Sequence, residues 1–167
     1  MGQYYKVVFL DADGKVVGSM GYFGCAKLME HSWNTCLGWL EEFIGPGGPF
    51  AEYRMVWAGD YADPEPGSAC NLYSLVNEEM TTGTGAAVAH AACLRYAVNL
   101  TSHEFVDVSE FVAAHDGLHP VPLLTCEGNG RGGGDYYGTY PHVGRWARCV
   151  VNLQDTPPPA DFECLGV

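Results

Sequence analysis

One segment of the sequence, residues 127–138, combines residue types that could bind an anion. It reads EGNGRGGGDYYG and places six glycines around Arg131 and Asp135. Backbone N–H groups of a glycine-rich loop can form a concave anion site, and an arginine can bind a phosphate or carboxylate through two hydrogen bonds. The candidate ligand-binding residues of this loop are Gly130, Arg131, Gly132, Gly133 and Asp135.

The same loop also has a purely structural interpretation, which we favour. Glycine in or between strands usually marks a bulge or a close backbone approach. In this interpretation Arg131 pairs with Asp135 or Glu127. Residues 128–133 match G-x-G-x-x-G, but a dinucleotide site needs a helix to follow, and the sequence continues with DYYGTYP. A phosphate-binding P-loop is excluded because no Gly-Lys-Ser/Thr is present.

A second candidate site is the acidic loop 59–65, which follows a predicted strand. Its carboxylates belong to Asp60, Asp63 and Glu65. Grouped carboxylates can perform acid–base chemistry or hold a divalent cation, although Asp63-Pro64 is also an ordinary turn signal. Asp60 and Asp63 are therefore candidate ligand-binding residues, and no metal site is predicted.

The seven cysteines predict neither a disulfide framework nor a zinc site, because they are dispersed and contain no C-x-x-C pair. Cys25 with His31, or Cys93 with His90, could form a nucleophile–base pair, but apolar surroundings favour inert thiols. The start MGQYYK has no secretory signal, and no apolar run reaches transmembrane length. We therefore expect reduced thiols, a cytoplasmic location and no membrane partner.

Composition indicates one acidic globular domain. The chain has 167 residues, 47% of them hydrophobic, and 8 Lys and Arg against 20 Asp and Glu, for a net charge of −12. This charge disfavours nucleic acid as a partner. We expect a single domain over residues 1–155 and an extended, proline-rich tail over residues 156–167.

The apolar patterning predicts an α+β fold with a mainly antiparallel sheet of about six to eight strands and helices packed on one side. Residues 25–44 should form the principal helix, with Trp33, Leu37 and Leu40 in the core. The other predicted helices are residues 86–94 and 110–115, the latter capped by Ser109. The predicted strands are residues 3–10, 15–20, 54–58, 71–76, 95–100, 104–108, 121–126 and 146–153.

An internal duplication is possible. Residues 5–17 and 96–108 are both hairpin-like and both precede a predicted helix. Each helix is followed by a Gly/Pro-rich segment and a strand containing arginine and tryptophan. Hairpin-then-helix is also a common unit, so duplication and coincidence both remain open.

Several strings taken together resemble a known group of proteins. They are MGQYYKVV at the start, KLMEHSW at 27–33, RMVWAGDYAD at 54–63, NLY at 71–73 and GNGRGGGD at 128–135. In this order they resemble the small uncharacterised bacterial and phage proteins that open with MGQYY. The resemblance implies one intact domain and carries no catalytic residue, cofactor or function.

Two functions fit the sequence. The first is a non-catalytic binding or interaction module that uses the glycine-rich loop 127–138 and the acidic loop 59–65, with another protein or a small anionic ligand as partner. The second is a small hydrolase-like or nucleotide-handling enzyme using Asp60, Asp63, Arg131 and Asp135. We favour the first because no complete catalytic constellation can be assembled. The enzyme requires the two loops to line one cleft.

Overall fold

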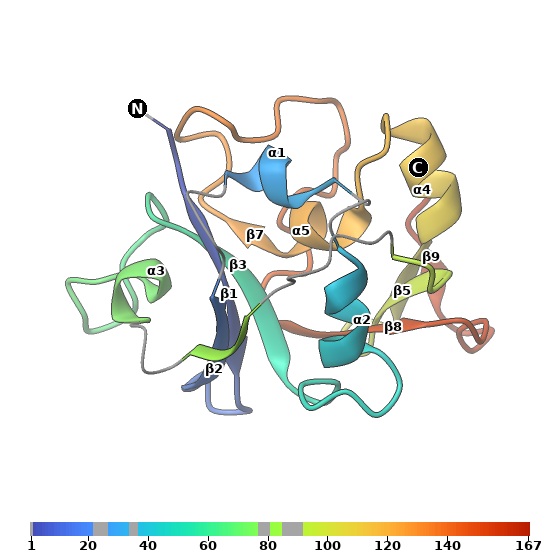
Figure 1. Cartoon of the computed structure of the whole chain (residues 1–167), viewed down its shortest axis with the longest axis horizontal. Coiled ribbons are helices and arrows are strands. Elements are labelled where there is room, and N and C mark those ends of the chain that lie inside the picture. Colours follow the sequence, from blue (N-terminus) through green and yellow to red (C-terminus); the bar gives the residue numbers. More distant parts are fainter. Residues whose placement is uncertain (1, 22–26, 34–36, 77–80, 85–91) are drawn as a thin grey trace.

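The computed structural model describes residues 2–21, 27–33, 37–76, 81–84 and 92–167. Within these residues, nine strands form one mainly antiparallel sheet (Figure 1). The predicted α+β class with a mainly antiparallel sheet is confirmed. The strands are β1 (Tyr5–Leu10), β2 (Val16–Gly21), β3 (Arg54–Gly59), β4 (Thr81–Thr84), β5 (Tyr96–Asn99), β6 (Glu104–Asp107), β7 (Cys126–Glu127), β8 (Cys149–Gln154) and β9 (Glu163–Cys164).

Five short helices accompany the sheet in the described part of the chain. They are α1 (Leu28–His31), α2 (Gly38–Ile44), α3 (Leu72–Leu75), α4 (Val108–Ala114) and α5 (Pro120–Thr125). Helices α1, α2, α4 and α5 contribute to the larger apolar cluster, on one face of the sheet. Helix α3 packs on the opposite face against Val8, Leu10 and Val56. The expected helical cover on one side is therefore accompanied by a smaller cover on the other.

The strand order is β4-β2-β1-β3-β8-β5-β6-β9, with β7 pairing to β3 outside this path. Each half of this order has the same connectivity. A hairpin (β1–β2 or β5–β6) is followed by helices, and a later strand returns antiparallel to the first hairpin strand. This strand is β3 in the first half and β8 in the second, where the two-residue β7 comes before it. A last short strand (β4 or β9) then pairs parallel to the second hairpin strand. This repeated connectivity is what an internal duplication would produce.

The core follows from the alternation of side chains along the two central strands of the first half. Val7, Phe9 and Trp57 face the larger cluster, whereas Val8 and Val56 face the smaller one. Both strands are therefore buried on both faces, which explains their continuous apolar sequences. Two of the three core anchors predicted for the principal helix are confirmed, because Leu37 and Leu40 are buried.

Trp33 is the exception, and its predicted core position is wrong: 45% of the residue is exposed. The first helix ends at His31, and Ser32 is its C-cap residue. Trp33 therefore lies beyond the helix end, where a helical spacing pattern no longer applies. The predicted single helix 25–44 consists of α1 and α2 in the described residues, and residues 22–26 and 34–36 lie outside them.

Two predicted strands are helices. Residues 71–76 contain α3, whose N-cap Asn71 accepts a hydrogen bond from the Ser74 N–H. Residues 121–126 contain α5, which starts with Pro120 and is capped by the His119 side chain. All six α5 residues are buried, and a short apolar run that is buried all round has no periodicity to separate helix from strand.

The remaining differences are local. Helix α4 is capped by the Asp107 carboxylate, which accepts hydrogen bonds from the Ser109 and Glu110 N–H groups, and not by Ser109. The strand predicted from residue 146 begins at Cys149. The tail contributes β9 to the sheet edge. Residues 85–91, most of the helix predicted at 86–94, lie outside the described residues.

Candidate functional site

The two loops singled out in the sequence lie side by side. The acidic loop leaves the end of β3, and the glycine-rich loop leaves the end of β7. These strands are parallel neighbours, with Trp57 opposite Cys126 and Ala58 opposite Glu127. Neighbouring parallel strands end at the same edge of a sheet, so both loops emerge together. The two loops therefore meet the geometric condition that the enzyme hypothesis set.

Arg131 joins the two loops. Its guanidinium donates to both carboxylate oxygens of Asp63, with distances of 2.7 and 3.0 Å, and to the Tyr61 carbonyl at 2.9 Å. Hydrogen bonds and the charge of Arg131 hold the pKa of Asp63 below its ordinary value. The expected partners of Arg131, Asp135 and Glu127, were wrong. Both members of the observed pair are well exposed, at 47% and 81% of their side chains.

The glycine-rich loop forms an anion nest, and the chain fills that nest itself. One oxygen of Asp135 accepts the backbone N–H groups of Gly130, Arg131 and Gly132 at 2.8, 2.9 and 2.9 Å. Its other oxygen accepts the Tyr5 hydroxyl at 2.9 Å. Burial and the Asp135 carboxylate raise the pKa of Tyr5, so this hydroxyl stays protonated. Asp135 is only 2% exposed, and the predicted site therefore holds an internal carboxylate.

Glycines from both loops make room for Gln3, whose importance the sequence reasoning missed. A Cβ atom on Gly59 would lie 2.1 Å from the Gln3 Nε2 atom, and one on Gly132 would lie 2.5 Å from its Cβ. Gln3 is fully buried, and its amide has no hydrogen-bond partner among the described residues. The only sequence signal for this packing was the presence of glycine in both loops.

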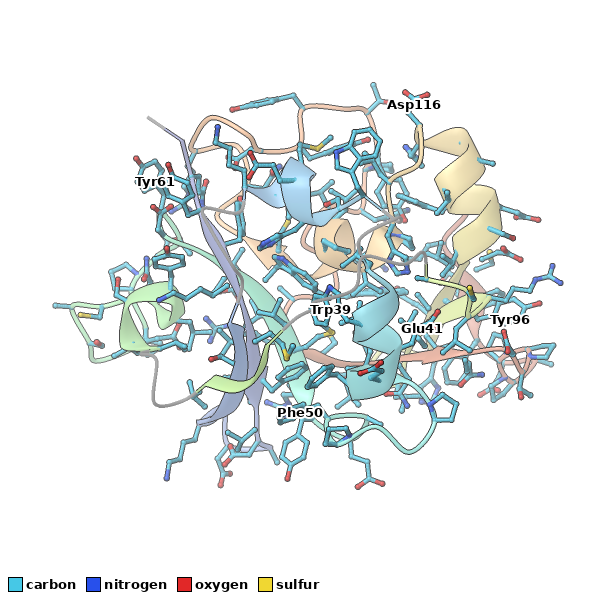
Figure 2. The ribbon with its side chains drawn as sticks, viewed as in Figure 1. Trp39, Glu41, Phe50, Tyr61, Tyr96 and Asp116 are labelled. Atoms are coloured by element: carbon cyan, nitrogen blue, oxygen red, sulfur yellow. The ribbon has the colours of Figure 1, made fainter. Side chains whose placement is uncertain are left out.

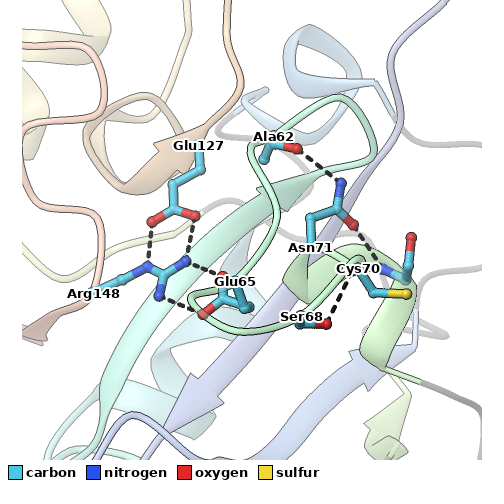
Figure 3. A network of polar contacts seen from close by, with 8 residues as sticks. Ala62, Glu65, Ser68, Cys70, Asn71, Glu127 and Arg148 are labelled. Atoms are coloured by element: carbon cyan, nitrogen blue, oxygen red, sulfur yellow. Dashed lines mark hydrogen bonds and ion pairs between the residues drawn. The ribbon is translucent and has the colours of Figure 1, made fainter.

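Arg148 forms a second, less exposed ion-pair network beside the first (Figure 3). Its guanidinium lies between Glu65 of the acidic loop and Glu127 at the end of β7, with hydrogen bonds of 2.9 Å to each. Hydrogen bonds from the arginine to both carboxylates raise the pKa of Arg148. Arg131, Arg145 and Arg148 are the three arginines in the last third of the sequence. The structure neutralises all three, since Arg145 pairs with Glu104.

Asp60 has a structural position. Its carboxylate accepts the Tyr4 N–H at 3.0 Å, and its own N–H donates to the Tyr4 carbonyl at 2.9 Å. Asn71 fixes the same loop by donating to the carbonyl oxygen of Asp60 and to that of Ala62. Figure 3 shows the contact with Ala62. These contacts hold Asp60 next to the start of β1. None of them involves the Arg131–Asp63 ion pair.

A depression of about 380 Å³ lies between the two loops, and we call it the charged depression. The depression contains three carboxylates and two guanidinium groups. Arg131 forms an ion pair with Asp63, and Arg148 forms ion pairs with Glu65 and Glu127. The residues that line it are Ala62, Asp63, Pro64, Glu65, Pro66, Glu127, Gly128, Arg131 and Arg148.

A larger pocket of about 530 Å³ lies along the second half of the glycine-rich loop, and we call it the aromatic pocket. Trp33 and Tyr137 line it, and 45% of Trp33 and 72% of Tyr137 are exposed to solvent. Figure 1 shows the glycine-rich loop, in orange, running from the β7 end of the molecule towards α4. The pocket is lined by Met29, Trp33, Ala114, His115, Asp116, Leu118, Asp135, Tyr136, Tyr137, Gly138 and Thr139.

The walls of the aromatic pocket are fixed by backbone contacts. Trp33 forms an isolated bridge with Leu118, and Gly117 lies under its ring. The Tyr137 hydroxyl donates to the Gly132 carbonyl. Tyr136 and Tyr137 both line this pocket, and Tyr136 also belongs to the buried core, as do Tyr5, Tyr140 and Trp146.

The described residues contain no group of three or more His, Cys, Asp or Glu that could hold a metal ion. Cys25 and His90 lie outside the described residues, so neither proposed Cys–His pair can be assessed as a pair. The His31 Nδ1 accepts the Trp57 indole N–H at 2.7 Å, and burial lowers the pKa of His31 to about 3. Cys70, Cys126, Cys149 and Cys164 are free thiols, and burial raises the pKa of Cys126 to about 12.

Comparison of the chain with family models, curated proteins and solved structures found no match. The resemblance to the MGQYY proteins therefore stays a prediction. Among the described residues, no helix has both the length and the apolar character needed to cross a membrane.

Proposed function

We propose that the protein is a non-catalytic binding module and that its recognition surface is the aromatic pocket beside the glycine-rich loop. The observation that carries this proposal is the pair of large aromatic side chains, Trp33 and Tyr137, exposed at the wall of one pocket. Exposed aromatic groups at a concave site are typical of recognition surfaces, since rings bury a large area with few rotatable bonds.

The rigidity of the pocket supports the same proposal. One wall continues directly from the buried Asp135, which anchors three backbone N–H groups of the loop. The opposite wall is tied to Leu118 through the Trp33 bridge. A site that is already ordered loses less conformational entropy when a partner binds.

The enzyme hypothesis is less well supported, although its two loops converge. Of the four residues in this hypothesis, Arg131 and Asp63 form an ion pair with each other. The carboxylates of Asp60 and Asp135 already accept hydrogen bonds from backbone N–H groups. An acid, base or nucleophile must reach a reacting atom. A small anion in the charged depression would have to displace carboxylates already bound to the arginines. A small anion bound in the charged depression is the second candidate ligand, after a partner bound in the aromatic pocket.

We also propose a cytoplasmic location. Cys70 and Cys164 are free thiols at the surface, and such thiols persist in a reducing compartment.

The test is a chemical-shift map of the isotope-labelled protein with three probes: indole, butylammonium chloride and sodium phosphate. We expect indole or butylammonium to shift the Trp33 indole N–H, the Tyr137 amide and the amides of residues 114–118. Trp33→Ala should abolish these shifts, whereas Tyr53→Ala, a change at an exposed aromatic outside the pocket, should keep them. Phosphate binding at Arg131 or Arg148, with no shift in the aromatic pocket for any probe, would overturn the proposal.

A further inference from the structure

We infer that the aromatic pocket receives a cationic side chain, lysine or arginine, from a basic segment of a partner protein. The inference rests on the proposed function and specifies its partner. The first observation is the charge of the lining. Among the described lining residues, Asp116 and Asp135 carry carboxylates, and none is a lysine or an arginine.

The Asp116 carboxylate is available for a partner. Asp116 is exposed, and none of the described residues forms a hydrogen bond or ion pair with its side chain. Figure 2 shows Asp116 at the outer edge of the molecule, beyond the end of α4. Its backbone has φ +51°, in the left-handed region where aspartate and asparagine are the most readily accepted of the larger residues. The turn therefore presents a carboxylate at the pocket edge at some conformational cost.

Several other carboxylates of the protein form ion pairs with arginines, whereas Asp116 forms none with the described residues. Asp63 binds Arg131, Glu65 and Glu127 bind Arg148, and Glu104 binds Arg145. Asp107 binds Arg95, so four of the five arginines in the sequence contact carboxylates. Asp116 is an exposed carboxylate without an ion pair among the described residues, and it lines a pocket with aromatic rings.

The aromatic walls complement the same ligand. A cation over the face of a tryptophan or tyrosine ring is attracted by the ring quadrupole, and the aliphatic stem of lysine or arginine packs along apolar surface. Trp33 and Tyr137 supply exposed rings, and Met29 supplies an adaptable apolar contact. An anionic side chain would meet these rings and Asp116 without a compensating positive charge among the lining residues.

The charge of the whole protein favours a basic partner as well. A formal net charge of −12 over 167 residues attracts positively charged segments and accelerates their encounter. Long-range attraction brings a basic segment to the protein, and the pocket provides the place where one of its cations is desolvated and held.

The test uses three peptides of sequence Ac-GGSGXGSGG-amide, in which X is lysine, Nε-acetyl-lysine or glutamate, titrated into the labelled full chain. The lysine peptide should shift the Trp33 indole N–H and residues 114–118. The acetyl-lysine peptide should bind about threefold to tenfold more weakly, the range expected for loss of a cation–π contact. Raising the salt concentration should weaken the lysine peptide more than the acetyl-lysine peptide.

Asp116→Asn is the matched variant, because asparagine also tolerates the left-handed backbone. It should weaken the lysine peptide about twofold to fivefold and leave the acetyl-lysine peptide unchanged. Glu110→Gln removes an exposed charge from α4 outside the pocket lining and should change neither peptide. Equal effects of the two variants would assign the attraction to overall charge and overturn the inference.

The outcomes separate the inference from the proposed function. Equal or tighter binding of the acetyl-lysine or glutamate peptide at Trp33 would overturn the cationic occupant and leave the binding module intact. If no peptide shifts the pocket while indole does, the inference also fails alone. If neither the peptides nor the small probes shift the pocket, both proposals fail.

Discussion

The two sides of the glycine-rich loop use similar residue types in opposite ways. In the charged depression, every carboxylate of the lining contacts an arginine, and the nest behind it is filled by Asp135. In the aromatic pocket, Asp116 has no cation among the lining residues, and Trp33 and Tyr137 face solvent. Residues that satisfy one another stabilise a fold, whereas groups left unsatisfied at the surface are available to a partner.

The residues beside the charged depression have the composition of an anion site, which is why the sequence predicted one there. Glycine, arginine and aspartate in one loop are the components of an anion site, and the structure does assemble such a site. Its anion is the Asp135 carboxylate of the same loop. The chemical prediction of a nest was therefore sound, and the identity of its occupant was not visible in the sequence.

The largest expected effect separates core from pocket within the segment once predicted to be one helix. Leu40→Ala should lower the free energy of unfolding by about 2–5 kcal/mol, because Leu40 is fully buried. Trp33→Ala should cost less than about 1 kcal/mol, because nearly half of the residue is exposed. Urea titrations measure both, and equal costs would mean that Trp33 is a core residue and not a recognition residue.

The next effect concerns the filled nest. Asp135→Ala should lower the free energy of unfolding by about 2–3 kcal/mol, since it leaves the Tyr5 hydroxyl and three backbone N–H groups without their acceptor. Asp135→Asn keeps one acceptor oxygen and should cost less. Restoration of the Ala variant's thermal stability by added acetate would show an exogenous anion replacing the carboxylate. An Ala variant as stable as the wild type would contradict the structural role of the nest.

The two arginines of the charged depression should differ. Arg148→Ala should cost about 1–3 kcal/mol, because it removes charge-assisted hydrogen bonds to the less exposed Glu65 and Glu127. Arg131→Ala should leave the melting temperature nearly unchanged, because both Arg131 and Asp63 are exposed. Thermal melts of the two variants provide the comparison. A larger loss for Arg131→Ala would reverse their assigned roles.

A further effect is a pH dependence of stability that neither side of the loop causes. Burial lowers the pKa of His31 and of His119 to about 3. Below the unfolded pKa of about 6.5, the unfolded chain binds protons that the folded chain does not, so stability falls from pH 6.5 towards pH 4. Urea midpoints across this range measure the loss. His31→Gln should reduce the slope, and an unchanged midpoint from pH 7 to pH 4 would contradict the neutral buried histidines.

The sequence predicted the elements that local interactions specify. The β1–β2 and β5–β6 hairpins were found because two short apolar runs flank a recognisable turn in each of them. The convergence of the two loops was not predictable, because it depends on pairing of β3 with β7. That strand has two residues and lies about 70 positions further along the chain, so it leaves no periodic signal.

The aromatic pocket was missed for related reasons. Trp33 was assigned to the core because its spacing continued a helical pattern beyond the point where α1 ends. Asp116 carried no signal, since its turn follows α4 and meets Trp33 through the neighbouring Gly117 and Leu118. This pocket is formed by contacts between segments far apart in the sequence, and local sequence patterns do not predict such contacts.

The most direct test of the central claim is one titration of the labelled protein with butylammonium phosphate, which offers a cation and an anion together. The account predicts that the Trp33 indole N–H and the amides of residues 114–118 shift with the added salt. The amides of residues 130–132 should not move, because Asp135 already occupies them. Shifts at residues 130–132 with a stationary Trp33 would contradict the account.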